Sequence, residues 1–180
     1  RFNTDSSKLE IYNGDKWWEI DSTSPEEQTG GTRGVWASGN NPTYFSERMI
    51  ANIATTGNAV DFGHLTQDKN GAYGSASRTR GITFGGYDGS SRLAEIDYFD
   101  MGTDAIAQDF GDCNANRSAV NPSGNQTRMI AAGGYSPSCL ATIDYITIAA
   151  TGGAKDFGDL SYGSKVSSSH YNSSTRGIMA

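Results

Sequence analysis

The sequence predicts an all-β protein built from repeats, and three observations lead to that prediction. The motif T-R-G-I/V-x-x-G-G-Y recurs, with variations, from residues 32, 79, 127 and 175, so its starts lie 47, 48 and 48 residues apart. Glycine supplies 23 of the 180 residues and only 19% are charged, which suits short strands joined by tight turns. An aromatic content of 11% is enough to build a packed core. A fixed period of roughly 20 to 50 residues marks a repeat architecture.

Residues 1–31 are expected to form a hairpin and a polar linker ahead of the repeats. Apolar and polar residues alternate on both sides of Asn13-Gly14. An Asn-Gly pair in that setting signals a type I′ turn, because both central residues of this turn need a positive φ. We expect a two-stranded hairpin anchored by Trp17 and Trp18, followed by a linker rich in Ser, Thr and Gly.

Residues 32–180 divide into three repeats, 32–78, 79–126 and 127–174, followed by the opening strand of a fourth at 175–180. Each repeat is expected to contain a T-R-G strand, an aliphatic-Asp-Tyr strand, a strand that carries Asp-Phe-Gly, and a strand rich in Ser and Asn. The second strand is clearest at 143–148, where Ile143, Tyr145 and Thr147 share one face. Four short strands in about 48 residues match the size of one propeller blade.

Three repeats and one extra strand are too few to close a propeller, which needs about four to eight blades. An open stack would leave strand edges and an apolar face uncovered, and such edges invite pairing. We therefore expect oligomerisation or further chain to complete the fold. The strand at 176–180 would close a sheet in its own chain or add to a neighbour's sheet edge.

Several residues recur once per repeat, and this regularity predicts a role in the repeat rather than in chemistry. The arginines are expected to pair with Asp97, Asp144 or a turn carbonyl, with a glycan-binding ring of arginines as the alternative. The paired glycines are expected to permit close approach of backbones, since no helix follows that would make them a phosphate cradle. The predicted structural residues are Arg33, Arg80, Arg128, Arg176, Gly85, Gly86, Gly133, Gly134, Asp61, Asp109 and Asp156.

The three aspartates of this set belong to Asp-Phe-Gly blocks, a sequence whose Asp binds Mg²⁺ in protein kinases. No V-A-I-K strand and no H-R-D catalytic loop accompany them. Three copies at a fixed spacing are what a structural turn would give, and a structural role is the prediction.

No catalytic constellation stands out, so no catalytic residue, metal ligand or cofactor is predicted. No serine lies in a G-x-S-x-G elbow, and the two histidines have no fixed spacing. Asp100, Asp104 and Asp109 are candidates for a glycosidase carboxylate pair by number alone. Cys113 and Cys139 lie in different repeats and are expected to be two free thiols, or a disulfide if their Cα atoms lie within about 7 Å.

Charge and hydropathy exclude two classes of partner. The net charge is −6, and no block of Lys or Arg offers a face for a phosphate backbone. No apolar run approaches the roughly 18 to 20 residues that a membrane-spanning helix needs. We therefore expect neither nucleic-acid binding nor membrane insertion.

Aromatic residues in the variable turns are the candidate ligand or partner contacts, because aromatic rings stack on sugars and tyrosine is common at recognition loops. For half or more of them, packing between blades is the alternative. The set is Tyr44, Phe45, Tyr73, Tyr87, Tyr135 and Tyr171.

The chain shows three resemblances to known families, two in the repeats and one in the N-terminal segment. The order of a Gly-Gly strand, an aliphatic-Asp-Tyr strand and an apolar strand after a Thr-Gly turn resembles the kelch repeat, although Phe62, Phe110 and Phe157 replace its usual tryptophan. Residues 32–180 are similar to glycine-rich repeat arrays of tailed (marine, cyanophage-type) phage virions, with units T-R-G-x-x-x-G-G-Y, I-D-Y-I-T-I-A-T-T-G-N-A and D-F-G-D-L. The segment RFNT…LEIYNG…W resembles one found in phage fibres.

The resemblance implies kelch-like four-stranded blades in a non-enzymatic, extracellular structural protein at the virion surface, such as a tail fibre, tail or capsid-decoration module. Its partners would be copies of itself or other virion proteins, with cell-surface glycans as a further contact. The first alternative is a subunit of a bacterial or environmental extracellular filament joined by strand exchange. The second is a glycan-binding lectin or a carbohydrate-active propeller.

Overall fold

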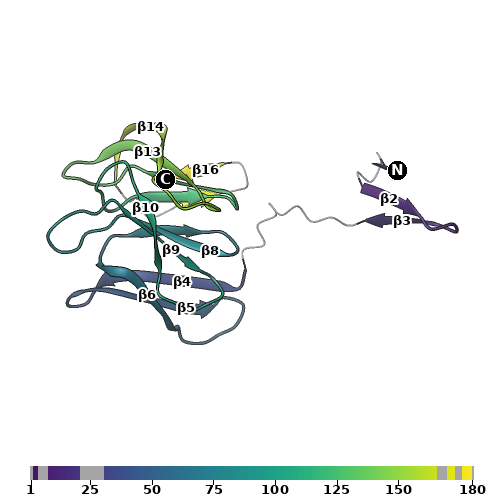
Figure 1. The fold of residues 1–180 in the computed structure, drawn as a ribbon, viewed down its shortest axis with the longest axis horizontal. Helices are drawn as coiled ribbons and strands as arrows, with labels where there is room; N and C mark the ends of the chain where they lie inside the picture. The colour runs from purple at the N-terminus through teal and green to yellow at the C-terminus, as the bar shows by residue number, and fades with distance from the viewer. Residues whose placement is uncertain (1, 4–7, 21–30, 166–169, 173–175, 180) are drawn as a thin grey trace.

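The computed structural model describes residues 2–3, 8–20, 31–165, 170–172 and 176–179, and over these ranges the chain consists of strands, turns and loops without a helix (Figure 1). Sixteen strands form five antiparallel sheets. The predicted all-β class is confirmed.

The N-terminal sheet contains the predicted hairpin and one further strand. Its strands are β1 (Phe2–Asn3), β2 (Lys8–Tyr12) and β3 (Trp17–Ile20). The predicted type I′ turn is wrong, because the register pairs Tyr12 with Trp17 and leaves a four-residue loop in which only Gly14 has a positive φ. The Asn13 side chain accepts hydrogen bonds from the backbone N–H groups of Asp15 and Lys16, so it closes the loop without a left-handed conformation of its own.

The remaining strands form three stacked sheets and the start of a fourth (Figure 1). The first sheet consists of β4 (Arg33–Asn40), β5 (Tyr44–Asn52) and β6 (Val60–Lys69). The second consists of β7 (Tyr73–Ala76), β8 (Arg80–Phe84), β9 (Glu95–Asp100) and β10 (Gln108–Asp112). The third consists of β11 (Asn121–Gly124), β12 (Arg128–Ala132), β13 (Leu140–Thr147) and β14 (Lys155–Ser164). The last pair is β15 (His170–Asn172) and β16 (Gly177–Met179).

The sheets are offset by one strand from the sequence repeats. The Ser- and Asn-rich strand that ends a repeat pairs with the T-R-G strand of the next one, so that the second sheet runs β7-β8-β9-β10 and the third runs β11-β12-β13-β14. The register is kept in the last pair, where Asn172 lies opposite Gly177 as Ala76 lies opposite Gly81. The first sheet has no such leading strand among the described residues, and β4 is its edge.

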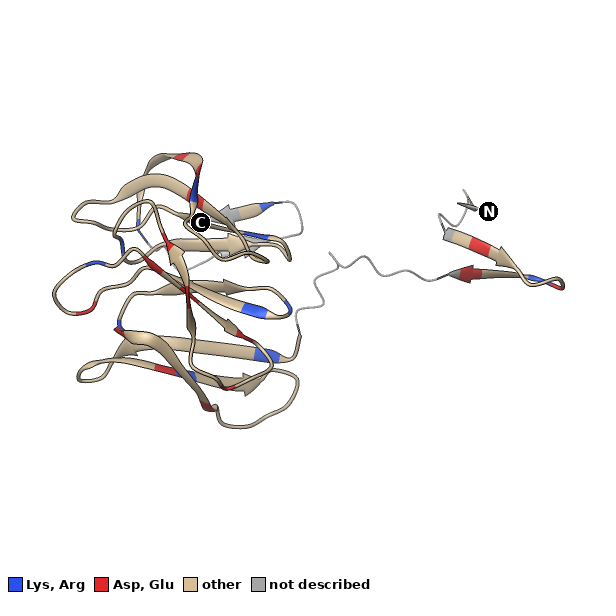
Figure 2. Cartoon of the chain, in the orientation of Figure 1, with Lys and Arg blue, Asp and Glu red and all other residues tan. Residues whose placement is uncertain are grey.

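Successive sheets pack along one direction, with β7 against β11 and β11 against both β15 and β16. Two buried apolar clusters lie between the sheets, one centred on Phe62 and Phe99 and the other on Phe84, Phe110 and Ile146. The described sheets form an open row, and no closed propeller is present over these residues. Lys and Arg residues are scattered along the row rather than gathered on one face (Figure 2).

Candidate functional site

The junctions between neighbouring sheets contain most of the recurring residues, and each junction has an apolar centre. Between the first and second sheets, the rings of Phe62 and Phe99 meet edge to face with their centroids 6.4 Å apart. Between the second and third sheets, Phe110 packs in one cluster with Ile146 and Ile148. Burial of each such side chain stabilises the fold by roughly 1.5–3 kcal/mol, so these contacts supply much of the cohesion of the row.

The Asp-Phe-Gly blocks form β-bulges in the strands at these junctions. In each block the Asp carboxylate accepts a hydrogen bond from the backbone N–H of the Gly two residues later, and each Gly has a positive φ. The distances are 3.0 Å for Asp61 and Gly63, 2.8 Å for Asp109 and Gly111, and 3.0 Å for Asp156 and Gly158. The aspartates therefore fix the bend of the strand.

Two of these glycines lie against the backbone of the following sheet. A Cβ added at Gly63 would lie 2.3 Å from the carbonyl oxygen of Asp104, and one at Gly111 would lie 2.5 Å from that of Gly152. Nothing lies within 4 Å of the same position at Gly158. The bulge thus lets two backbones approach closely at both junctions, while the third copy faces open space.

Backbone hydrogen bonds join the sheets beside the first two bulges. The N–H of Ala107 donates to the carbonyl of His64 at 2.8 Å, and the N–H of Ala154 donates to the carbonyl of Asp112 at 2.7 Å. The two bonds join equivalent positions of successive repeats, so the junction is the same structure made twice.

The arginines of the T-R-G motif reach forward to the next sheet. Arg33 Nη1 donates to the carbonyl oxygen of Met101 at 2.5 Å, and Arg80 Nη1 donates to that of Ile148 at 2.7 Å. These are the carbonyls at the start of the turn after the second strand, as one of the sequence alternatives expected. Arg128 lies with its guanidinium carbon 4.6 Å from the centre of the Tyr145 ring, and Arg176 is exposed just before β16.

The paired glycines permit a second close approach. At Gly85 and Gly133, a Cβ would lie 2.1 and 2.3 Å from the carbonyl oxygens of Arg117 and Ser164. The glycines that follow them donate their N–H groups to the same carbonyls at 3.0 and 2.7 Å. Only a residue without a side chain fits at these two positions.

A buried ion pair also crosses each junction, and it uses the aspartates of the second strand. Lys69 Nζ lies 2.6 Å from Asp97 Oδ2 and 3.1 Å from Glu95 Oε2. Thr66 donates to the other oxygen of Asp97 at 2.6 Å. Burial raises the pKa of Asp97 above its usual range in spite of the Lys69 charge. Burial acts in the same direction on the pKa of Glu95, but the hydrogen bond from Gln67 and the charge of Lys69 together hold it below its usual range.

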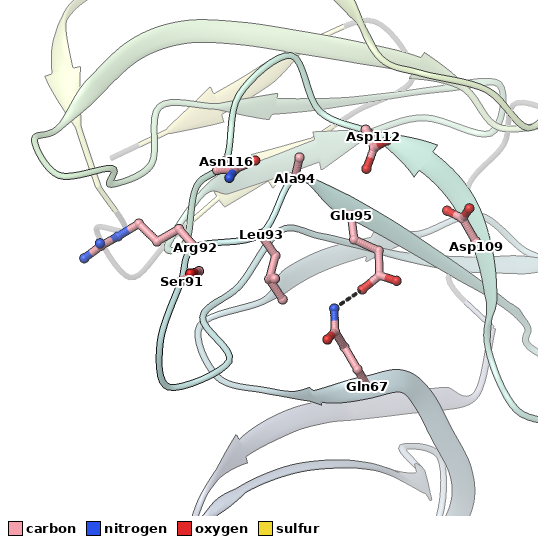
Figure 3. Close-up of a pocket in the computed structure, with 9 residues that line it drawn as sticks. All are labelled: Gln67, Ser91, Arg92, Leu93, Ala94, Glu95, Asp109, Asp112 and Asn116. Atoms are coloured by element: carbon pink, nitrogen blue, oxygen red, sulfur yellow. Dashed lines mark hydrogen bonds between the residues drawn. The ribbon is translucent and has the colours of Figure 1, made fainter.

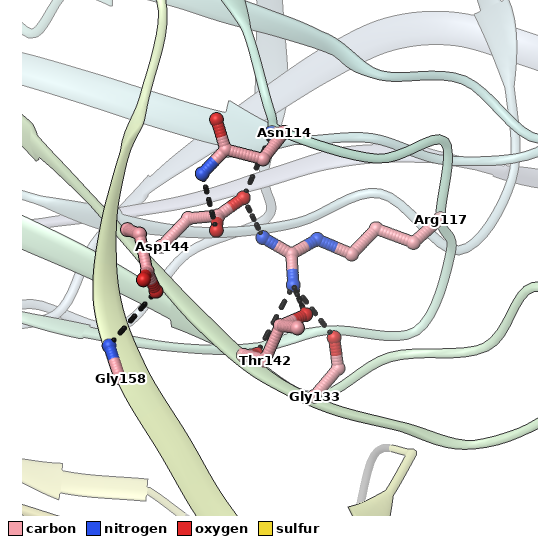
Figure 4. A network of polar contacts seen from close by, with 7 residues as sticks. Asn114, Arg117, Gly133, Thr142, Asp144 and Gly158 are labelled. Atoms are coloured by element: carbon pink, nitrogen blue, oxygen red, sulfur yellow. Dashed lines mark hydrogen bonds and ion pairs between the residues drawn. The ribbon is translucent and has the colours of Figure 1, made fainter.

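Arg117 occupies the place of Lys69 in the next repeat and pairs with Asp144 (Figure 4). The other guanidinium nitrogen donates to the carbonyl of Gly133 at 3.0 Å and to Thr142, and Asn114 donates to Asp144 through both its backbone and its side chain. Asp97 and Asp144 therefore pair with buried cations from the preceding repeat. Of the partners expected for the T-R-G arginines, the two aspartates are wrong, and the turn carbonyl is the one that Arg33 and Arg80 contact.

Arg48 is a buried cation without a carboxylate in contact. It has no solvent exposure, and its guanidinium lies against the rings of both Phe62 and Phe99, 5.1 and 4.2 Å from their centres. One nitrogen donates to the carbonyl oxygen of Ala105 in the next sheet. Burial lowers the pKa of Arg48 from its usual value, although Asp61 and other nearby carboxylates oppose that shift.

Three of the candidate contact tyrosines form a ladder with basic side chains across successive repeats. Tyr44 and Tyr87 meet edge to face with ring centroids 5.9 Å apart. The Arg92 guanidinium carbon lies 5.6 Å from the Tyr87 ring and 4.4 Å from the Tyr135 ring, and Lys165 Nζ lies 4.9 Å from the latter. These rings are partly exposed and also pack between repeats.

The other candidate aromatics do not join this ladder. Phe45 lies against Gly39, and Tyr73 is 38% exposed on β7. Tyr171 lies in β15, and its side chain is outside the described residues.

A shallow cavity of about 390 Å³ lies between the first and second sheets (Figure 3). Its carboxylates come from Glu95, Asp109 and Asp112, and Gln67 donates to Glu95 at 2.7 Å. Since Asp109 already accepts the N–H of Gly111 and Glu95 is held by Gln67 and Lys69, two of the three carboxylates are occupied by structural contacts. Of the candidates for a glycosidase pair, Asp100 lines a different cavity and accepts the N–H of Gly102 at 2.6 Å.

Metal and membrane features are absent from the part of the chain that the structure describes. No group of three or more His, Cys, Asp and Glu side chains there could hold a metal ion. No helix long and apolar enough to cross a membrane occurs in those ranges. Both cysteines are free thiols, with Cys113 buried and Cys139 exposed.

No protein-family model matches the chain, and no curated protein matches its sequence. Sequence reasoning missed Lys69 and Arg117, the buried cations of the two junctions. A signal was present, because Lys69, Arg117 and Lys165 are basic residues at intervals of 48.

Proposed function

We propose that this chain is a non-enzymatic structural protein of the virion surface of a tailed phage, such as a tail fibre, tail or capsid-decoration module, built from kelch-like blades. The viral setting rests on the resemblance of residues 32–180 and of the N-terminal segment to phage structural proteins. The structural role has independent support from the contacts at the junctions between the sheets.

The observation that carries the structural role is that the recurring residues make their contacts at the junctions between sheets. At both internal junctions, a T-R-G arginine, an Asp-Phe-Gly glycine and a buried cation make contacts between one sheet and the next. Residues that recur once per repeat and join each sheet to the next suit a structural protein that grows by adding repeats. The carboxylates nearest to a cavity are largely occupied by contacts of the same kind.

Contact with host glycans would take place on the ladder of Tyr44, Tyr87 and Tyr135. Its rings are partly exposed, and the interleaved Arg92 and Lys165 favour acidic sugars over neutral ones. A glycan array with the purified chain tests this point. Binding that a Tyr87→Ala/Tyr135→Ala variant retains would show that the ladder is not the contact.

The virion assignment is tested on particles of a tailed phage whose genome encodes the chain. Antibodies against the chain should label intact particles at one morphological position under immunogold electron microscopy, and mass spectrometry of purified particles should detect its peptides. Detection in infected cells but not in purified particles would exclude the virion role.

A further inference from the structure

The two ends of the row of sheets expose the two halves of the junction that occurs twice inside it. The first half is the head face, which we define as the outward face of the first sheet with Trp36, Met49, Ala51 and Ile53. Trp36 is 54% exposed, Met49 43% and Ile53 64%. The residues equivalent to Ile53 in the second and third sheets are Met101 and Ile148, and both are buried against the preceding sheet.

The second half is the tail face of the third sheet, defined by Arg128, Tyr145, Phe157 and Gly158. Phe157 is 54% exposed, whereas the equivalent Phe62 and Phe110 are 7% and 2% exposed because the next sheet covers them. The space that the following sheet fills at the first two glycine bulges is open at Gly158. Among the described residues, no carbonyl of a following sheet accepts a hydrogen bond from Arg128.

The internal junctions specify the contacts that the tail face would make with a head face. By equivalence with Arg33 and Arg80, Arg128 would donate to the carbonyl oxygen of Ile53. The N–H of Ala59 would donate to the carbonyl of Asp159, as Ala107 and Ala154 do within the chain. Phe157 would come to lie on the apolar surface of the head face.

The charges of the two faces are also compatible. Lys165 stands in the place of Lys69 and Arg117, and it is exposed. The head face has Met49 where the second and third sheets have a buried aspartate, but Glu47 stands in the place of Glu95, which lies 3.1 Å from Lys69. Lys165 would therefore pair with Glu47.

Strand pairing is the last feature that favours contact between a tail face and a head face. Among the described residues, the first sheet has no counterpart of the leading strand that β7 and β11 provide to the second and third sheets, and β4 is its edge. In the last pair, β15 is a leading strand and β16 occupies the place of the T-R-G strand. The sequence Thr-Arg-Gly-Ile at 175–178 matches Thr-Arg-Gly-Val at 32–35, so β4 can replace β16 in the same register.

We infer that the chain binds a second copy of itself head to tail, with β4 of the second copy in the place of β16 beside β15 and its head face on the tail face. The first sheet of the second copy would then become four-stranded. Because two different surfaces meet, each bound copy exposes a new tail face, and the product is a closed ring or a filament. This inference deepens the proposed structural role by naming its partner.

The test uses two variants of the full chain, each with one face blocked. Ile53→Asp places a charge on the head face, and Phe157→Asp places one on the tail face. Both side chains are more than half exposed, so both variants are expected to fold, with circular dichroism as the check. We expect the wild-type chain to form assemblies in analytical ultracentrifugation and each variant alone to be monomeric, with association weakened by on the order of tenfold or more.

A mixture of the two variants distinguishes a head-to-tail contact from any other. Each variant keeps one intact face, so the mixture should form a heterodimer and stop at two chains. Ile106→Asp is the matched control, because Ile106 is 67% exposed in a turn of the second sheet, and it should assemble like the wild type. Removal of residues 173–180 should strengthen association, since β15 is then without its competing partner.

Three results would overturn the inference: a monomeric wild-type chain at its highest soluble concentration, a mixture that stays monomeric, or a removal of residues 173–180 that abolishes assembly. None of these results bears on the presence of the chain in phage particles. Conversely, absence from particles would leave the head-to-tail contact intact.

Discussion

Lys69 and Asp97 form an ion pair between the first and second sheets, with 2.6 Å between Nζ and Oδ2 and no solvent exposure on either side chain. Arg117 and Asp144 repeat this relationship at the next junction, 48 residues further along for the cation. A buried ion pair costs desolvation energy for both charges, so it is a weak source of net stability, but loss of one partner is expensive. This asymmetry gives the first prediction.

Lys69→Met should destabilise the fold by about 3–5 kcal/mol, because Asp97 is left buried without a counter-charge. The free energy of unfolding from urea titrations measures the effect. Lys165→Met is the matched control, since Lys165 has the same place in the third repeat but is exposed, and its effect should stay within about 0.5 kcal/mol. A Lys69→Met/Asp97→Leu double variant should recover part of the loss. Equal effects of Lys69→Met and Lys165→Met would contradict the importance of the buried pair.

Alanine substitutions at two of the glycine bulges can be compared, because the backbone conformation is similar at both and only the presence of a neighbouring sheet differs. Gly111 and Gly158 have φ of 137° and 135°, so alanine suffers a similar conformational penalty at either position. At Gly111 the new Cβ also meets the backbone of Gly152 at 2.5 Å, whereas at Gly158 it meets nothing. Gly111→Ala should therefore be the more destabilising change by about 1–3 kcal/mol.

Thermal unfolding of the two variants at low protein concentration, where self-association is avoided, provides the measurement. A lower melting temperature for Gly111→Ala than for Gly158→Ala is expected. If the two variants melt together, the close approach of backbones at the junction does not limit stability.

The repeating arginines differ in the same way between the interior and the end of the row. Arg80 donates to the carbonyl of Ile148 at 2.7 Å and lies over the Tyr98 ring, while Arg128 lies over the equivalent Tyr145 ring. A hydrogen bond from a charged donor contributes roughly 1.5–3 kcal/mol. Arg80→Met should lower the free energy of unfolding, measured by urea titration, by that amount. Arg128→Met should lower it clearly less. Equal losses in the two variants would mean that the contact with the tyrosine ring, which both arginines make, and not the carbonyl, is what the arginine provides.

The sequence was sufficient for the fold class and for the place of most strands. The period of 48 residues locates the T-R-G strands, and the alternation predicted in 143–148 falls on β13 as far as its last residue, Thr147, because both patterns are local. The offset between repeats and sheets was not predictable, since a strand such as β7 has no local feature that says whether it pairs backward or forward along the chain. The hairpin turn was predicted too tight, because Asn13 closes a four-residue loop through its side chain.

Only some of the contacts at the junctions could be predicted from the sequence. The recurring Asp-Phe-Gly and Gly-Gly blocks indicated structural turns, and the contacts of Gly63 and Gly85 give the physical reason. The partners of Asp97 and Asp144 could not be assigned without the stacking of the sheets. Lys69 is 28 residues from Asp97 in the chain, and Arg117 is 27 residues from Asp144. Arg48, a buried cation in the place of an aliphatic residue, breaks the repeat pattern and gave no signal.

Cys113 provides a prediction on pH. Burial raises the pKa of the Cys113 thiol to about 11 from an ordinary 9.0, because the thiolate is poorly solvated beside the apolar cluster. Between pH 9 and 11 the unfolded chain therefore loses this proton while the folded chain keeps it. The folded state binds more protons in that window, so its stability falls as the pH rises, by about 2–3 kcal/mol in total.

The measurement is the free energy of unfolding of the wild type and of Cys113→Ala from pH 8 to pH 11, because subtraction removes the contribution of lysines and tyrosines that titrate in the same range. The wild type should lose more stability than the variant as the pH rises. Cys139→Ala, which changes an exposed thiol, should follow the wild-type curve. Thiol labelling at pH 8 should modify Cys139 rapidly and reach Cys113 only under denaturing conditions, and rapid labelling of both in the folded chain would show that Cys113 is not enclosed between the second and third sheets.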